Sequence, residues 1–134
     1  MIPIEQLNLN NNATVYMSTY INGQCGSCIN TFTNWNDLLI TSKNNKEFQI
    51  YIYVYTPNKE NFIKYYYPDE IQSYPIILDT NKKYLKVNGL SDYNDFTTFL
   101  LNSNKEVVLI GNPSNSKKLM KLYKQEINKK LGNQ

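Results

Sequence analysis

Histidine and arginine are both absent from this chain of 134 residues, and cysteine occurs only twice. A closed zinc site needs four ligands, so a metal site within one chain is a poor interpretation. All 14 cationic residues are lysine, which leaves out the planar guanidinium groups favoured for reading phosphates and bases. No apolar run approaches the roughly 20 residues of a membrane span. We therefore expect no metal, no nucleic-acid partner and no membrane span in this chain.

Length and composition indicate a globular chain. The net charge is a modest +3, and aromatic and branched residues recur densely between the asparagine runs, which a disordered chain would lack. We expect a single domain over residues 1–134, with 1–12 as an N-terminal extension. Residues 1–4 show neither a basic segment nor an apolar signal core, so either the protein is cytoplasmic or an export or anchor segment has been removed.

Both cysteines lie in the stretch QCGSC, residues 24–28. Such a pair can be a redox couple, half of a metal site or a structural staple. Residues 14–20 are rich in β-branched and aromatic side chains and predict a strand, followed by a loop with Asn22 and Gly23. After the pair, apolar residues recur at helical spacing up to about Ile40, namely Cys28, Ile29, Phe32, Trp35, Leu38 and Leu39. The pattern predicts that the two cysteines lie at the entrance of an amphipathic helix.

The remaining chain predicts an alternation of strands and helices that ends in a hairpin and a last helix. Phe48–Tyr55 carries large groups on both faces, which is typical of a central strand covered on two sides. Asn58 can cap a short helix that ends near Pro68. We further expect a strand at 75–78, a helix at 82–87 before Gly89, a hairpin of 97–101 with Val107–Ile110, and a helix at 116–131 before Gly132.

This order resembles the thioredoxin-like fold, in the branch shared by peroxiredoxins and extracytoplasmic thiol-disulfide oxidoreductases of the cytochrome-maturation type. The stretch YPIILDTNKKYLKVNGL, residues 74–90, looks like the strand and helix inserted in that branch. TTFLLNSNKEVV, residues 97–108, looks like its closing hairpin. The resemblance implies an α/β three-layer sandwich, with a mixed central sheet, a C-terminal antiparallel hairpin and helices on both faces.

The position of the cysteine pair and the resemblance together suggest thiol-disulfide exchange. Unpaired N–H groups at a helix entrance favour a thiolate, so Cys25 is expected to be the nucleophile and Cys28 the resolving thiol. Gly26 and Ser27 leave the approach to Cys25 open. The expected partners are proteins that carry a disulfide or a dithiol, with no cofactor beyond the cysteine pair. We expect a monomer. The resemblance favours a periplasmic or membrane-anchored location, and a cytoplasmic location is the alternative.

The chain also departs from active relatives near the expected site. Relatives place a cis-proline directly before the strand that corresponds to Thr97, where this chain has Phe96. They usually have tryptophan before the first cysteine, where Gln24 stands here. Thr19 stands near the place of a buried carboxylate. We expect a trans peptide before Phe96 and a ring that shields the disulfide or contacts a selected partner, so Phe96 and Thr97 join the expected substrate-binding residues.

Two other activities of this fold need residues that this chain lacks. By the same resemblance, a peroxidase of this branch would have a different cysteine motif with a nearby arginine, and a copper-delivery protein of a related branch would have a histidine. A non-catalytic binding scaffold with a structural disulfide stays open as the alternative, because fold does not imply function. The sequence also leaves open whether the protein would act as reductant, oxidant or isomerase.

Three further features of the sequence have ordinary explanations. Trp35 is expected in the core. The tyrosines at 65–67 are expected to pack partly buried rather than to rim a binding surface. The lysines of the last helix are expected to form its solvated face, and they are Lys117, Lys118, Lys121, Lys124, Lys129 and Lys130.

Overall fold

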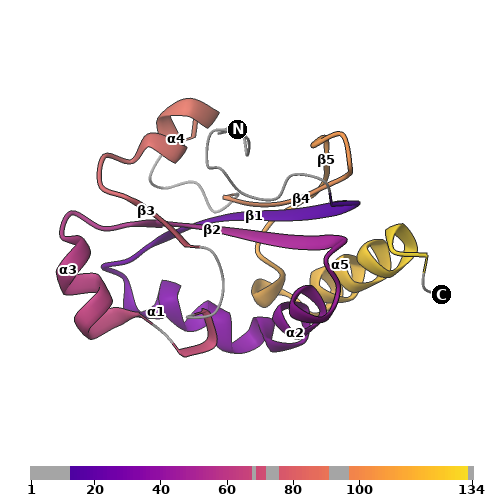
Figure 1. Ribbon diagram of the computed structural model, residues 1–134, viewed down its shortest axis with the longest axis horizontal. Coiled ribbons are helices and arrows are strands. Elements are labelled where there is room, and N and C mark those ends of the chain that lie inside the picture. The colour runs from indigo at the N-terminus through magenta and orange to yellow at the C-terminus, as the bar shows by residue number, and fades with distance from the viewer. Residues whose placement is uncertain (1–12, 68, 72–75, 91–96, 133–134) are drawn as a thin grey trace.

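Strand β1 (Val15–Asn22) lies at the centre of a five-stranded sheet in the computed structural model, which describes residues 13–67, 69–71, 76–90 and 97–132 (Figure 1). The strand order is β3-β2-β1-β4-β5. β2 (Phe48–Tyr55) runs parallel to β1, and β3 (Ile76–Asp79) runs parallel to β2. β4 (Thr98–Leu101) and β5 (Val107–Ile110) form an antiparallel hairpin beside β1. The predicted mixed sheet and its closing hairpin are confirmed.

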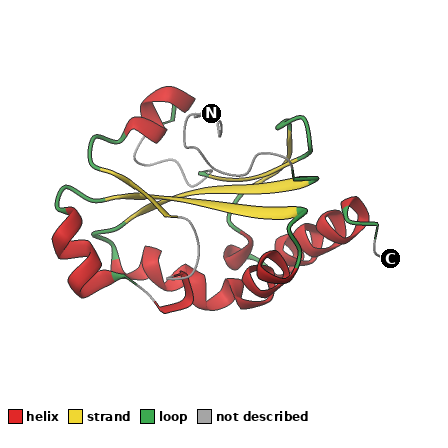
Figure 2. Ribbon diagram, in the orientation of Figure 1, coloured by secondary structure: helices red, strands yellow, loops and turns green. Residues whose placement is uncertain are grey.

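Helices cover both faces of this sheet (Figures 1 and 2). One face carries four helices, namely α1 (Gly26–Ile29), α2 (Asn36–Asn44), α3 (Lys59–Asn61) and α5 (Lys117–Lys130). The opposite face carries α4 (Lys83–Asn88). The predicted three-layer arrangement is therefore confirmed.

The central strands are buried on both faces because their side chains alternate between two cores. On the helix-rich face, Met17 of β1 and Ile50 of β2 pack with Trp35 and Tyr123. On the α4 face, the strands present a row of tyrosines that packs around Tyr84. Trp35 is fully buried, as the sequence predicts.

The helix after the cysteines departs from its predicted form. Instead of one α-helix to about Ile40, α1 is followed by a 3-10 turn (Asn30–Trp35) and then by α2, which extends to Asn44. A 3-10 helix has three residues per turn, so side chains three apart lie on one face. Ile29, Phe32 and Trp35 have this spacing and pack together against the sheet. Their packing accounts for the tighter winding.

The predicted caps at Asn58 and Gly89 are present, and Ser116 is a further cap. Asn58 accepts a hydrogen bond from the Asn61 N–H, and Ser116 accepts one from the Leu119 N–H at the start of α5. Gly89 ends α4 in a left-handed conformation that glycine adopts without steric cost. The structure adds Asp79, whose carboxylate accepts hydrogen bonds from the backbone N–H groups of Asn81, Lys83 and Tyr84.

The prediction for the tyrosines at 65–67 is wrong for two of them. Phe62–Tyr66 form a π-helical turn in which only Phe62 is buried, while the exposed fractions of Tyr65 and Tyr66 are 65% and 49%. Tyr67 packs against Phe62 with ring centroids 5.8 Å apart. The wider π turn changes the phase of the side chains and directs its two tyrosines outward.

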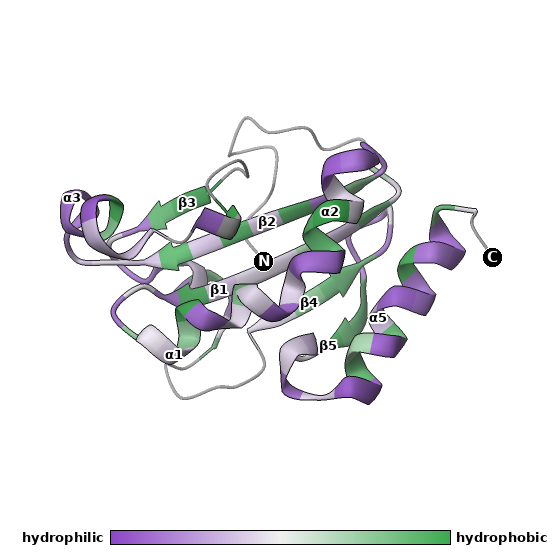
Figure 3. Ribbon diagram, turned by 90° about the horizontal axis from the view of Figure 1, so that it is seen from below, coloured by the Kyte–Doolittle hydropathy of each residue, from purple (hydrophilic) through white to green (hydrophobic). Residues whose placement is uncertain are grey.

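The last helix has the predicted amphipathic form, seen as alternating hydrophobic and hydrophilic residues of α5 in Figure 3. Tyr123 and Ile127 are buried on its inner face. Its six lysines are exposed or half-buried, which confirms the solvated face. One of them, Lys124, forms an ion pair of 2.8 Å with Asp37 of α2.

Candidate functional site

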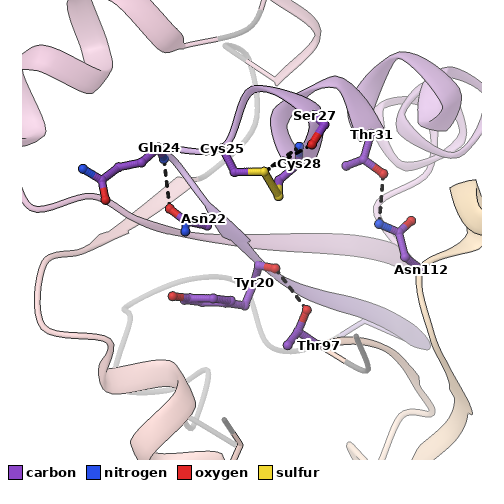
Figure 4. Close-up of a disulfide and its surroundings, with 9 residues drawn as sticks. All are labelled: Tyr20, Asn22, Gln24, Cys25, Ser27, Cys28, Thr31, Thr97 and Asn112. Carbon is purple, nitrogen blue, oxygen red and sulfur yellow. Dashed lines mark hydrogen bonds between the residues drawn. A yellow bond between two sulfur atoms is a disulfide. The ribbon is translucent and has the colours of Figure 1, made fainter. Parts of the chain in front are cut away.

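Cys25 and Cys28 form a disulfide at the carboxyl end of β1 (Figure 4). Their Cα atoms are 5.2 Å apart, within the usual range for a disulfide. Asn22, the last residue of β1, organises the loop before them. Its carbonyl accepts from the Cys25 N–H at 3.1 Å, and its side-chain oxygen accepts from the Gln24 N–H at 2.9 Å. The end of the central strand therefore positions the first cysteine.

Gly23 brings this loop close to β2. Its N–H donates to the Tyr55 carbonyl at 2.7 Å. A Cβ at this position would lie 2.7 Å from the same carbonyl oxygen and 2.9 Å from Cγ1 of Val54. Real Cβ atoms do not approach backbone oxygen so closely, so only glycine lets the loop lie here without a shift.

The sulfur of Cys25 lies among hydrogen-bond donors. Cys25 caps α1, and its Sγ accepts from the Cys28 N–H at 3.2 Å (Figure 4). The Ser27 hydroxyl lies 3.4 Å from the same sulfur. Hydrogen bonds to a charged form favour that form, so these are the donors that a thiolate at Cys25 needs. Both cysteines are partly exposed, and Cys28 packs against the core.

A pocket of about 480 Å³ opens beside Cys28. Its walls come from the end of β1, the segment after the cysteines, the residue before β4 and the turn after β5. The lining residues are Tyr20, Ile21, Asn22, Ser27, Cys28, Asn30, Thr31, Asn34, Thr97, Asn112, Ser114 and Asn115. The pocket thus shares its wall with the disulfide.

A ring of three polar side chains forms one wall of the pocket. Asn112 donates through Nδ2 to the Thr31 hydroxyl at 2.9 Å. Thr31 is hydrogen-bonded to the Ser114 hydroxyl, which donates to Oδ1 of Asn112 at 2.8 Å. The same Oδ1 accepts from Nε1 of the buried Trp35 at 3.0 Å. The core tryptophan therefore fixes the amide that closes the ring.

Thr97 and Thr19 lie where the sequence suggested. Thr97 donates from its hydroxyl to the Tyr20 carbonyl at 3.2 Å, and its own carbonyl accepts from the Tyr20 N–H at 3.0 Å (Figure 4). Thr19 is fully buried, with its hydroxyl 2.8 Å from that of Thr98. β1 carries no carboxylate. Phe96 lies outside the described residues, so its shielding role stays a prediction.

The structure brings five of the six predicted site residues together around one disulfide and its pocket, and the sixth, Phe96, lies outside the described residues. Gly26, Ser27 and the cysteines are contiguous, and Thr97 enters from the other side of the pocket. The pocket residues of the β5–α5 turn were not predicted, because they meet Thr31 only through the fold. The many asparagines in the sequence are a weak signal for such a pocket, because composition does not indicate which asparagines lie close together in the fold.

Other kinds of site are not seen in the part of the chain that the structure describes. Within residues 13–67, 69–71, 76–90 and 97–132, no three of the metal-binding side chains histidine, cysteine, aspartate and glutamate gather in one place. None of the helices in these ranges has the length and apolar character that crossing a bilayer requires.

Several solved structures with a similar fold are named as thiol-disulfide oxidoreductases or thioredoxins. A candidate thiol:disulfide interchange protein DsbE from Chlorobium tepidum shares 18% identity at a TM-score of 0.62, over 90% of this chain and 82% of the other. The thioredoxin domain of a thiol-disulfide oxidoreductase from Bacteroides vulgatus shares 12% identity at a TM-score of 0.61, over 84% of this chain and 81% of the other. A candidate thioredoxin from Neisseria meningitidis shares 18% identity at a TM-score of 0.62, over 92% of this chain and 78% of the other.

These similarities establish the fold. No family model matches the sequence, and none of the curated proteins matches it. The chain has the thioredoxin-like fold that the order of its elements predicts, with a cysteine pair at the entrance of the first helix. What that pair does is inferred from its own geometry.

Proposed function

We propose that this protein is a thiol-disulfide oxidoreductase that exchanges its Cys25–Cys28 disulfide with dithiols or disulfides of partner proteins. The observation that carries this proposal is the position of Cys25. Its sulfur caps α1, accepts the Cys28 N–H and remains partly exposed. A sulfur that is both accessible and hydrogen-bonded can act as nucleophile and as leaving group.

In the reducing direction, the Cys25 thiolate attacks one sulfur of a partner disulfide. The partner's S–S bond breaks, its second sulfur leaves as a thiolate, and Cys25 is joined to the partner in a mixed disulfide. Cys28 then loses its proton and attacks Sγ of Cys25. The partner's first sulfur leaves as a thiolate, and the Cys25–Cys28 bond forms. Two electrons pass from the protein to its partner, and the oxidising direction is the reverse.

The alternative, a purely structural disulfide in a binding scaffold, has a weaker physical basis. Linking residues three apart closes a very short loop, so the constraint on the unfolded chain contributes only about 2 kcal/mol. The same segment is already held by backbone hydrogen bonds from Cys25 to Asn22 and from Ile29 to Cys25. A bond here therefore stabilises the fold less than a disulfide that closes a long loop would.

Partner selectivity and location belong to the same proposal. The tyrosines exposed on the π-helical turn and the pocket beside Cys28 are surfaces for contact with a particular partner. An extracytoplasmic location is supported by the oxidoreductase resemblance, and the candidate DsbE protein from Chlorobium tepidum has the same fold. The proposal further takes the protein to be a monomer.

Insulin reduction by dithiothreitol tests the activity. Wild-type protein should accelerate it, and Cys25→Ser should abolish the acceleration. Cys28→Ser should trap a mixed disulfide that a reducing agent releases, because no resolving thiol is left. If the wild type gives no acceleration and Cys28→Ser traps no disulfide partner, exchange chemistry is refuted and the scaffold interpretation is favoured.

A further inference from the structure

We infer that the pocket beside Cys28 selects substrate disulfides whose cysteine is flanked by uncharged polar side chains. This inference rests on the proposed function and adds the class of substrate. The disulfide bond joins the attacking sulfur of Cys25 directly to Cys28 in the pocket wall. In the mixed disulfide that bond is open, and the backbone hydrogen bonds from Cys25 to Asn22 and from Ile29 to Cys25 keep Cys25 next to Cys28. The neighbours of a substrate cysteine bonded to Cys25 therefore lie at the mouth of this pocket.

The deep wall of the pocket offers hydrogen-bonding groups in fixed orientations. In the ring, Asn112 donates to Thr31 and Ser114 donates to Asn112, so the Thr31 hydroxyl hydrogen points to Ser114. Each hydroxyl oxygen keeps acceptor capacity, and the Asn112 amide has a second N–H. Because Trp35 holds the Asn112 oxygen, the amide cannot rotate freely to suit another ligand.

The mouth of the pocket carries more amides. Asn30, Asn34 and Asn115 are exposed there, and Asn22 stands at the end of β1. A side-chain amide supplies both donors and acceptors. Among the described residues that line the pocket, none is lysine, aspartate or glutamate.

This lining discriminates between classes of side chain. A charged side chain that enters loses hydration and meets no opposite charge among the described lining residues, which is costly. An apolar side chain covers the ring without satisfying its hydrogen bonds, which is also costly. Amide and hydroxyl side chains can exchange their hydrogen bonds with water for hydrogen bonds with the wall. Asparagine, glutamine, serine and threonine are therefore the favoured neighbours of the substrate cysteine.

Four peptide disulfides test this inference directly. They are symmetric dimers of acetyl-Gly-Xaa-Cys-Xaa-Gly-amide, with Xaa as asparagine, aspartate, lysine or leucine. Reduced protein is mixed with each dimer, quenched in acid and separated by chromatography to give a single-turnover rate. Dividing by the rate with dithiothreitol removes the intrinsic reactivity of each dimer. We expect the asparagine dimer to react about fivefold faster than each of the others, the effect of roughly one hydrogen bond.

A charge placed at the mouth should redirect the preference. Asn34→Asp puts a carboxylate beside the pocket and should raise the lysine-to-aspartate rate ratio about fivefold. Asn44→Asp is the matched control, because Asn44 is exposed at the far end of α2 and changes the net charge equally. That control should leave the ratio unchanged.

The outcomes separate this inference from the proposed function. Equal normalised rates for all four dimers, with turnover, would overturn the selection and leave exchange chemistry standing. A ratio shifted as much by Asn44→Asp as by Asn34→Asp would also overturn it, because a general field would then set the preference. If the protein reduced none of the dimers and also failed with insulin, both the selection and the proposed function would be wrong.

Discussion

Replacing Gly23 by alanine tests whether the redox loop depends on its close approach to β2. The added Cβ would lie 2.7 Å from the Tyr55 carbonyl oxygen, and this atom belongs to the backbone of a buried strand. The loop must therefore lift. Lifting loses the Gly23 N–H bond, about 1 kcal/mol, and adds about 1–3 kcal/mol of overpacking. Alanine also restricts the unfolded chain, which adds back about 0.4–1 kcal/mol of stability. The net loss in the free energy of unfolding is therefore about 1–3 kcal/mol.

Urea unfolding of the oxidised protein measures this loss. With a slope of about 1–3 kcal/mol per molar urea, the midpoint of Gly23→Ala should fall by roughly 1 M. Gly26→Ala is the matched control, because no atom lies within 4 Å of a Cβ built there and alanine is the better helix former. An unchanged midpoint for Gly23→Ala, or an equal fall for Gly26→Ala, would refute the assigned role of the close approach.

Three further predictions concern the sulfur, the ring and the buried tyrosines. In reduced protein, limiting iodoacetamide near neutral pH should label Cys25 before Cys28, and Ser27→Ala should slow that labelling, because it removes a group 3.4 Å from the sulfur. Asn112→Ala should lower the free energy of unfolding by about 1–3 kcal/mol, since it leaves the buried Trp35 N–H without its acceptor. Burial raises the pKa of Tyr84 to about 12, so its contribution to stability should be complete below pH 10 and lost as the pH rises from 10 to about 12.

Each of these has a result that contradicts it. Equal labelling of the two cysteines counts against the assigned roles. For the ring, the control is Asn115→Ala, because Asn115 is an exposed neighbour. If both variants lowered the free energy of unfolding equally, the bond between Asn112 and Trp35 would have no special role in stability. For the tyrosine, chemical denaturation at a series of pH values should show the alkaline decline reduced in Tyr84→Phe, and an identical decline would exclude its contribution.

Much of the fold is predictable because strands and helix ends depend on residues that are close together in the sequence. The large groups on both faces of β2 indicate a central strand, and Asn58, Ser116 and Gly89 mark helix ends through the backbone groups they satisfy or the conformation they allow. The cysteine pair is likewise local, and its helix entrance follows from the residues beside it.

The rest depends on contacts between distant segments. The ring joins Thr31 to Asn112 across 81 residues, and the glycine approach is decided by which backbone atom lies opposite it. The spacing of apolar residues along the sequence predicts neither the ring nor the close approach of Gly23. The outward tyrosines were mispredicted for a related reason. A π-helical turn shifts the phase of the side chains within five residues, and the sequence pattern assumes an α-helix there.

The reduction potential of the Cys25–Cys28 couple tests the central claim most directly. It is measured by equilibrating the protein in buffers of defined glutathione or dithiothreitol poise and counting free thiols after an acid quench. Exchange chemistry predicts a reversible two-electron transition between about −270 and −120 mV, the range of thioredoxins and disulfide-exchange proteins. A transition below about −300 mV, typical of structural disulfides, would contradict the account.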